Sequence, residues 1–340
     1  MVAVLALIVS GCGNDDDEAG GGGLPAVMAT TSIWADVVAN VACDGLADVI
    51  TLIPPGGDPH AFQPSLQDRG RMEAAVMIVA NGLDLEEGLE DTIDAVEEAG
   101  TPVFYMADHI ATIGFAPGME LEHHDEEEEE EEEHHDEEEE EEHHDEEDGD
   151  EHHDEEEEEE EHGHGAEDPH VWFDPIRVAD ALPALSRALA SEAGLDAAAL
   201  DACVSEYRGE LMALDAEIDE ILASLSLEER LLVTNHDALG YFADRYQFEL
   251  VGTVIPGGTS VGAANPAELQ ELIGLIGQTG VTAIFAESSH SSQDAEALGR
   301  EADVQVVTLD TGSLGPAGSD SDTYISYLRI NAQKIAEGLG

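Results

Sequence analysis

Three histidines and one aspartate stand at positions where a chain holds polar side chains with little conformational freedom. His60 lies in a loop rich in proline and glycine, and His170 has prolines close on both sides. His236 and Asp310 each follow a short apolar run that predicts a buried strand. Parallel sheets bind ligands at the carboxyl ends of their strands and in the crevice between two halves, so we expect these four side chains to face one cleft.

This set of side chains suits a tetrahedral divalent cation. Neutral imidazole is a borderline-soft donor, and zinc accepts nitrogen at about 2.0 Å and oxygen at about 2.0 to 2.2 Å. Four ligands close the coordination shell, which indicates binding rather than catalysis. A zinc hydrolase would need an open position and a general base, and the sequence has no His-Glu-x-x-His pattern to supply them. We therefore do not expect an enzyme.

The charge and the motifs of the chain argue against nucleic-acid and membrane-surface binding, and against a transport ATPase or a permease. Its 340 residues include 80 acidic and 10 basic side chains, a formal net charge of -70. Nucleic acid and anionic membrane surfaces are therefore poor partners, and cations are the natural ligands. The sequence has no Gly-x-x-x-x-Gly-Lys motif of a transport ATPase, and no apolar run of about 18 residues that a permease would need.

Short apolar runs alternate with longer amphipathic segments, which predicts strands alternating with helices and therefore parallel sheets. The predicted strands fall into two sets of four, separated by an acidic block and a long helix. They are residues 27–31, 49–53, 76–80 and 103–106, then 231–234, 250–254, 282–286 and 304–309. We expect an α/β protein with two parallel-sheet (β/α) lobes.

A long amphipathic helix is predicted between the two sets of strands. From Leu200 to Leu225, apolar residues recur at alternating spacings of four and three, which gives one apolar face over about 25 residues. At about 1.5 Å per residue the helix reaches nearly 40 Å, enough to run along two lobes. A coiled-coil dimer is the competing interpretation, but the pattern is confined to one segment with few basic partners. We expect a monomer.

The N-terminal residues resemble a bacterial lipoprotein signal. The apolar run is too short to span a bilayer and ends in Val-Ser-Gly-Cys, so Cys12 would carry the lipid and residues 14–23 would form a flexible tether. A basic region is missing before the run, which we attribute to a start codon assigned too late. An ordinary buried strand is the alternative. The resemblance implies an extracytoplasmic protein, anchored by lipid to the outer face of the cell membrane.

Apart from Cys12, the proposed lipid attachment site, the chain has two cysteines. Cys43 and Cys203 form an even count in what the signal makes an exported, oxidising compartment. We expect a disulfide between them, and two isolated buried thiols are the alternative.

An acidic block interrupts the first set of strands. From Glu120 to Glu161, 32 of 42 residues are Asp or Glu, so the segment cannot bury enough apolar surface to fold, and we expect residues 120–167 to form a disordered loop. Its paired histidines and carboxylates would bind zinc weakly and raise the local cation concentration. These auxiliary donors are His123, His124, His134, His135, His143, His144, His152, His153, His162 and His164.

Four stretches of the chain, at 55–65, 168–175, 235–242 and 285–287, together resemble the zinc and manganese solute-binding proteins of ABC transporters. The resemblance extends from Val27 to the C-terminus. It implies two four-stranded parallel α/β lobes joined by one long rigid helix. A metal ion would be bound in the cleft between the lobes and delivered to an ABC permease with its ATPase.

By motif, His60, His170 and His236 match the family's histidine ligands, and Asp310 matches its C-terminal carboxylate. Many manganese-type members have glutamate at the third position, so the resemblance favours Zn²⁺ over Mn²⁺ as the transported ion. Glu287 would either replace Asp310 or orient a ligand. His290 is a further auxiliary donor, with an ordinary exposed loop residue as the alternative.

These observations predict a high-affinity zinc receptor of an ABC uptake system. A manganese receptor of the same type is the main alternative, separable by whether a hexacoordinate ion competes with zinc. A secreted zinc-dependent hydrolase and a surface adhesin with an incidental metal are the alternatives from other classes. The expected organisation is a signal and tether (1–23), an N-terminal lobe (24–195), a linking helix (196–225) and a C-terminal lobe (226–340).

Overall fold

The computed structural model describes most of the chain after residue 22. The described residues are 23–43, 45–115, 167–255, 257–262, 264–289 and 291–340. The proposed lipid attachment site at Cys12, the acidic block with its ten histidines, and His290 lie outside them.

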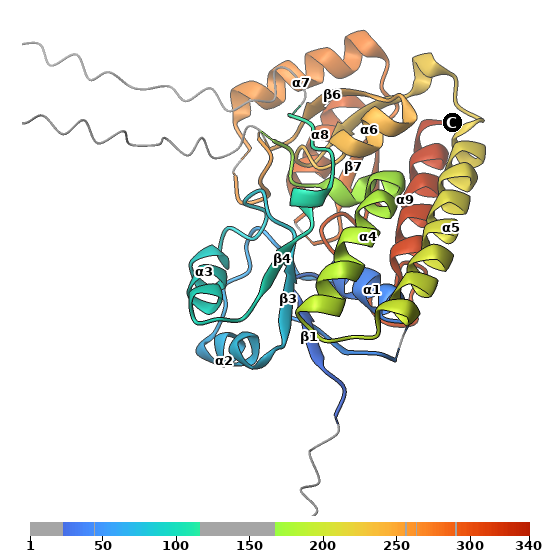
Figure 1. Cartoon of the computed structure of the whole chain (residues 1–340). Helices are drawn as coiled ribbons and strands as arrows, with labels where there is room; N and C mark the ends of the chain where they lie inside the picture. The colour runs from blue at the N-terminus through green and yellow to red at the C-terminus, as the bar shows by residue number, and fades with distance from the viewer. Residues whose placement is uncertain (1–22, 44, 116–166, 256, 263, 290) are drawn as a thin grey trace, which may run out of the picture.

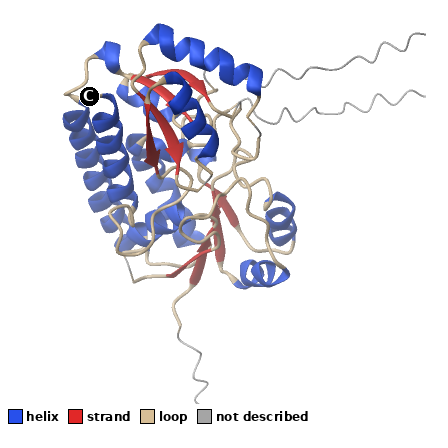
Figure 2. Cartoon of the chain, turned by 180° about the vertical axis from the view of Figure 1, so that it is seen from behind, coloured by secondary structure: helices blue, strands red, loops and turns tan. Residues whose placement is uncertain are grey.

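Two wholly parallel four-stranded sheets form two lobes (Figure 1, Figure 2). The strand orders are β2-β1-β3-β4 and β6-β5-β7-β8, so the two sheets have the same connectivity. The bounds are β1 (Ala26–Ala29), β2 (Asp48–Thr51), β3 (Met77–Ala80) and β4 (Val103–Tyr105), then β5 (Leu231–Thr234), β6 (Glu249–Thr253), β7 (Ala283–Glu287) and β8 (Gln305–Leu309). The predicted fold class is confirmed, with strand ends within two residues of those expected.

One difference between a predicted and an observed strand end has a local cause. The first strand was expected to reach residue 31, but it ends at Ala29 because Thr31 caps the following helix. The Thr31 side chain accepts a hydrogen bond from the Trp34 backbone nitrogen at 3.3 Å, which satisfies one of the free N–H groups at the helix N-terminus.

Helices cover both faces of each sheet, as buried parallel strands require. In the N-terminal lobe they are α1 (Ser32–Val41), α2 (Leu66–Ala74), α3 (Glu90–Glu98) and α4 (Pro175–Ser191). The linking helix α5 (Ala197–Leu222) follows, and the C-terminal lobe has α6 (Gly240–Tyr246), α7 (Pro266–Thr279), α8 (Gln293–Ala302) and α9 (Tyr324–Leu339). Short 3₁₀ turns occupy Ala107–His109, Val171–Phe173 and Leu227–Glu229.

Strand β3 shows why both sheet faces must be covered. All four of its side chains are buried. Because successive strand side chains point to opposite faces, Met77 and Val79 join a core cluster with α1 and α4, whereas Ile78 and Ala80 join another with α2 and α3. A continuous apolar run therefore fixes a strand with helices on both sides.

Helix α5 lies beside α4 and α9 (Figure 1). Its repeating apolar face, which includes Leu200, Leu211 and Ile218, is buried in the main core of the same chain. The face that suggested a coiled coil is therefore occupied within the protein. Of the helices in the described ranges, none has the length and apolar character to cross a membrane.

Each end of α5 is attached to a different lobe. Cys203, near its N-terminal end, forms the expected disulfide with Cys43 just after α1. Farther along the helix, Asp215 accepts two hydrogen bonds from Arg245 of α6, at 2.8 and 2.5 Å. The pair Glu217–Arg329 ties the same part of α5 to α9. The helix thus spans both lobes.

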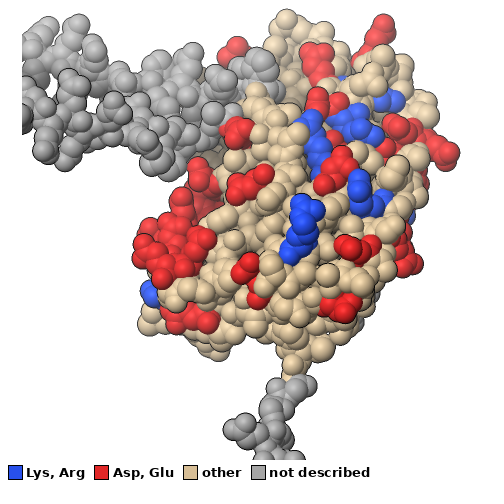
Figure 3. All heavy atoms as spheres, in the orientation of Figure 1, with Lys and Arg blue, Asp and Glu red and all other residues tan. Residues whose placement is uncertain are grey.

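Charges are unevenly distributed over the face seen in Figure 3. Acidic side chains gather at the left, where Figure 1 places α3, and most visible basic side chains lie over the helices at the right. Ion pairs also join neighbouring elements, for example Arg208 with Asp180 and Arg177 with Asp244. These two arginines thus connect helices to one another.

Candidate metal centre

His60 follows β2 in the predicted turn-rich loop and is 5% exposed. Asp58, two residues earlier, accepts a hydrogen bond from the His60 backbone nitrogen at 3.1 Å. The loop ends at α2, whose capping box joins Ser65 and Asp68. These local bonds hold the loop, and therefore the imidazole, in place.

His170 is 1% exposed and is the third residue of the stretch 168–175. One oxygen of Asp168 accepts from its backbone nitrogen at 2.9 Å and lies 2.8 Å from its Nδ1. Tyr241 donates its hydroxyl hydrogen to the Asp168 carbonyl oxygen at 2.8 Å. This histidine is therefore fixed by a carboxylate of its own loop, which is in turn held by α6.

His236 is 2% exposed and follows β5 of the C-terminal lobe. The Thr234 hydroxyl donates to its carbonyl oxygen at 2.7 Å. On the ring, Nδ1 contacts an oxygen of Glu287 at the end of β7, and the other oxygen of that carboxylate accepts from the Thr311 hydroxyl at 2.6 Å. Glu287 thus orients the imidazole of His236, one of the two roles expected for it.

The three imidazoles converge on one point. Nε2 of His170 lies 3.2 Å from Nε2 of His60 and 3.1 Å from Nε2 of His236. Within the described ranges, these are the His, Cys, Asp or Glu side chains that group at metal-binding distance, with ligand atoms all within 4.8 Å of one another. Tetrahedral zinc with bonds of about 2.0–2.1 Å separates its nitrogen ligands by about 3.3–3.4 Å. The observed spacing is close to that value.

The carboxylates determine which ring nitrogen faces the centre. A carboxylate beside Nδ1 favours the tautomer with hydrogen on Nδ1, which leaves the Nε2 lone pair free for a metal ion. Asp168 and Glu287 do this for His170 and His236. At His60, the nearest carboxylate to Nδ1 among the described ion pairs is that of Glu87, at 3.7 Å. All three rings therefore present Nε2 to the same space.

Burial also controls the ionisation of the centre. It lowers the pKa of His170 well below the ordinary value of 6.5, and the neighbouring His236 and His60 act in the same direction. Burial raises the pKa of Asp168 to about 7, opposed by the hydrogen bond from the His170 backbone. His170 is consequently neutral at physiological pH, the form that binds a metal ion.

The structure does not bring Asp310 into this group. One of its oxygens accepts from the Ser288 hydroxyl at 2.7 Å, and the other accepts from the Ser321 hydroxyl at 2.8 Å. Lys334 lies 3.9 Å from the second oxygen. The carboxylate is therefore held by neighbours on its own lobe, a set of contacts that its strand-end position alone did not reveal.

Sequence reasoning missed the orienting roles of Asp168 and Glu87. Asp168 was within the recognised Asp-Pro-His motif, so its place two residues before the ligand was an available signal. Glu87 follows β3 with no motif around it, and only the folded loop brings it to His60.

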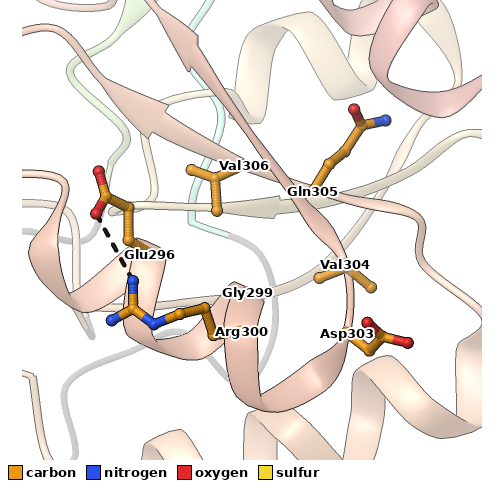
Figure 4. A pocket seen from close by; sticks show the side chains of 7 residues that line it. All are labelled: Glu296, Gly299, Arg300, Asp303, Val304, Gln305 and Val306. Carbon is orange, nitrogen blue, oxygen red and sulfur yellow. Dashed lines mark ion pairs between the residues drawn. The ribbon is translucent and has the colours of Figure 1, made fainter.

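A separate hollow of about 570 Å³ lies in the C-terminal lobe between α8 and β8 (Figure 4). Its lining includes the exposed pair Glu296–Arg300, 3.8 Å apart, and no histidine or cysteine. Of its two lining carboxylates, Glu296 and Asp303, the first already faces the Arg300 guanidinium. The histidine centre is therefore the better metal site.

The chain was compared with protein families and with known proteins. Residues 27–338 match the family model described as zinc-uptake complex component A, periplasmic (ZnuA). The zinc-binding protein TroA of Treponema pallidum is 27% identical, with 95% of this chain and 91% of TroA covered. The manganese-binding lipoprotein MntA of Bacillus subtilis is also 27% identical, with 100% and 98% covered.

The fold agrees with this assignment. The solved structure of the periplasmic zinc-binding protein TroA superimposes with a TM-score of 0.74 at 26% identity, covering 94% of this chain and all of TroA. The family model describes a component of a metal-uptake complex and these relatives are named for binding a metal, so the chain is not an enzyme. Because the family model spans both lobes and all three histidines, the chain belongs to the family of periplasmic component A of zinc-uptake complexes.

Proposed function

We propose that the protein is the zinc receptor of an ABC uptake system: it binds one Zn²⁺ ion between its lobes and delivers it to a membrane permease driven by an ATPase. The observation that carries this proposal is the convergence of three buried Nε2 atoms from two lobes, at 3.1 and 3.2 Å. Three neutral nitrogen donors match the preference of zinc better than that of manganese, which favours oxygen ligands.

We propose a carboxylate as the fourth ligand. Asp310 would leave Ser288 and Ser321 and turn towards the ion, while Glu287 keeps its contact with His236. Glu287 itself is the alternative fourth ligand. A tetrahedral shell of three imidazoles and one carboxylate carries a net charge of +1 with Zn²⁺, less than the charge of the bare ion.

A manganese receptor is the second candidate, because the similar protein MntA is named for manganese. Coordination geometry separates the two, since zinc takes four ligands and manganese prefers six. Co²⁺ is a suitable probe, because four-coordinate Co²⁺ absorbs visible light far more strongly than six-coordinate Co²⁺. We expect the strong absorption, and its stoichiometric loss when Zn²⁺ is added. Weak absorption that Mn²⁺ abolishes would favour manganese.

We also propose that the protein is held at the outer face of the membrane by a lipid on Cys12, and that the histidines of the acidic block collect zinc beside the cleft. The name of MntA as a lipoprotein supports the anchor. Labelling cells with a radioactive or clickable fatty acid tests it, because Cys12→Ser should abolish incorporation into the protein.

A further inference from the structure

A loop of the C-terminal lobe, residues 257–260, lies against the N-terminal lobe beside the histidines; we name it the rim loop. The ring of Phe115 packs so closely on Gly258 that a Cβ atom there would collide with it. Next to this contact, the hydroxyl of Ser260 donates to Oδ2 of Asp58 at 2.9 Å, and Ser260 is buried. The rim loop therefore bridges the two lobes.

The same carboxylate that receives Ser260 also holds a metal-binding histidine. Oδ1 of Asp58 accepts from the His60 backbone nitrogen at 3.1 Å, while Oδ2 accepts from Ser260. A second carboxylate, that of Glu87, lies 3.7 Å from Nδ1 of His60. Ser260 of the rim loop thus reaches a carboxylate that is hydrogen-bonded to the His60 backbone.

The contact of the rim loop with the N-terminal lobe opposes the separation of the lobes that metal release requires. The three histidines are only 1–5% exposed, so an ion leaves when the lobes or their loops part. A second contact between the lobes, in which the Ser313 hydroxyl accepts from the Gly56 nitrogen at 2.8 Å and lies 2.9 Å from the Ser32 hydroxyl, does not involve any residue that contacts His60. The Ser260 bridge joins lobe closure to His60 through Asp58, as the hydrogen bond from Tyr241 of α6 to the Asp168 carbonyl does for His170.

We propose that Ser260 is a positioning residue, a latch across the cleft that holds His60 through Asp58 and slows the release of bound zinc without touching the ion. The inference rests on the proposed function. The latch forms after the ion has entered, so its loss accelerates dissociation and leaves association almost unchanged.

The test measures both rates on zinc-loaded, untagged protein by rapid mixing with excess chelator and with free Zn²⁺. Ser260→Ala should release zinc about tenfold faster, which corresponds to 1.4 kcal/mol, with association within twofold and one tight ion per chain. Ser260→Thr keeps the hydroxyl and should restore slow release. Ser224→Ala is the matched control, because that exposed hydroxyl, in the turn after α5, donates to the carbonyl oxygen of Ile221 near the end of that helix.

A double-mutant cycle identifies the partner. Asp58→Ala should also accelerate release, and adding Ser260→Ala in that background should change the rate by less than twofold. Unchanged release in Ser260→Ala, or independent effects of the two substitutions, would overturn the latch while leaving a tight zinc receptor intact. Absence of tight zinc binding in the unsubstituted protein would instead overturn the proposed function, and the latch with it.

Discussion

Nε2 of His170 lies within hydrogen-bonding distance of Nε2 of both His60 and His236, and carboxylates lie beside the outer nitrogens of the three rings. Asp168 and Glu287 accept from Nδ1 of His170 and His236, so both Nε2 lone pairs point inward. Such lone pairs repel unless a cation lies between them. The carboxylates therefore hold the rings in an orientation suited to a metal ion. The repulsion between the Nε2 lone pairs is relieved when a divalent ion binds between them.

Removal of single imidazoles tests this arrangement. Replacing His60, His170 or His236 by Ala should each weaken zinc binding at least tenfold, or about 1.4 kcal/mol, because the loss of one donor opens the coordination shell. Competition titration against a chromophoric chelator measures the affinity. His109→Ala is the control, since that exposed ring stacks on Phe104 at 4.5 Å, away from the centre. Two of three variants with unchanged affinity would refute the site.

Asp310→Ala should have a smaller effect. Asp310 is held by Ser288 and Ser321, so it must give up these bonds to reach the ion, and water or Glu287 can take its place. We expect a loss of affinity below tenfold in the same titration. A loss as large as that of the histidine variants would show that Asp310 is an equal ligand.

Zinc affinity should fall in acid, because a metal-bound imidazole must be neutral and its ordinary pKa is about 6.5. The lowered pKa of His170 keeps this ring unprotonated to lower pH than an ordinary histidine. Affinity should therefore fall steeply below about pH 6, but with fewer than three protons competing per ion. Titrations between pH 5 and pH 8 measure this slope. Acid-insensitive binding would indicate a site dominated by carboxylates.

At the scale of elements, the strands and the long helix could be predicted from the spacing of apolar residues, because that spacing is a property of each segment alone. Continuous apolar runs such as β3 identified buried strands, and the spacing of Leu200, Leu211 and their neighbours identified α5 within a few residues. Asp310 was placed correctly after β8, but its bonds to Ser288 and Ser321 depend on loops distant in sequence. Contacts made only by tertiary packing, such as Ser260 with Asp58, leave no periodic signal.

The disulfide should contribute to stability and not to metal coordination. Cys43 and Cys203 are 160 residues apart, so their bond closes a long loop and reduces the entropy of the unfolded chain. Replacing both by Ser should lower the free energy of unfolding by about 2–5 kcal/mol, measured by urea denaturation of the metal-free protein. Zinc stoichiometry should stay at one tight ion. Loss of the tight site in a variant that remains folded would contradict this division of roles.

At the scale of the whole molecule, the three grouped histidines come from both lobes. His60 and His170 belong to the N-terminal lobe and His236 to the C-terminal lobe, with α5 attached to both. Neither lobe alone supplies three imidazoles, so tight binding requires the assembled protein. On the proposed function, the acidic surface and acidic block would attract cations in general, whereas the preorganised centre would select one.

The central claim is that one tight zinc site lies in the cleft and is independent of the acidic block. The direct measurement is the zinc content of untagged protein after exhaustive dialysis, for the full chain and for a variant lacking Glu120–His164, which contains ten histidines and none of the proposed cleft ligands. We predict one retained zinc ion per chain in both, lost when His170→Ala is added to the deletion variant. If the deletion variant retains no zinc, the cleft is not the primary site and the account is wrong.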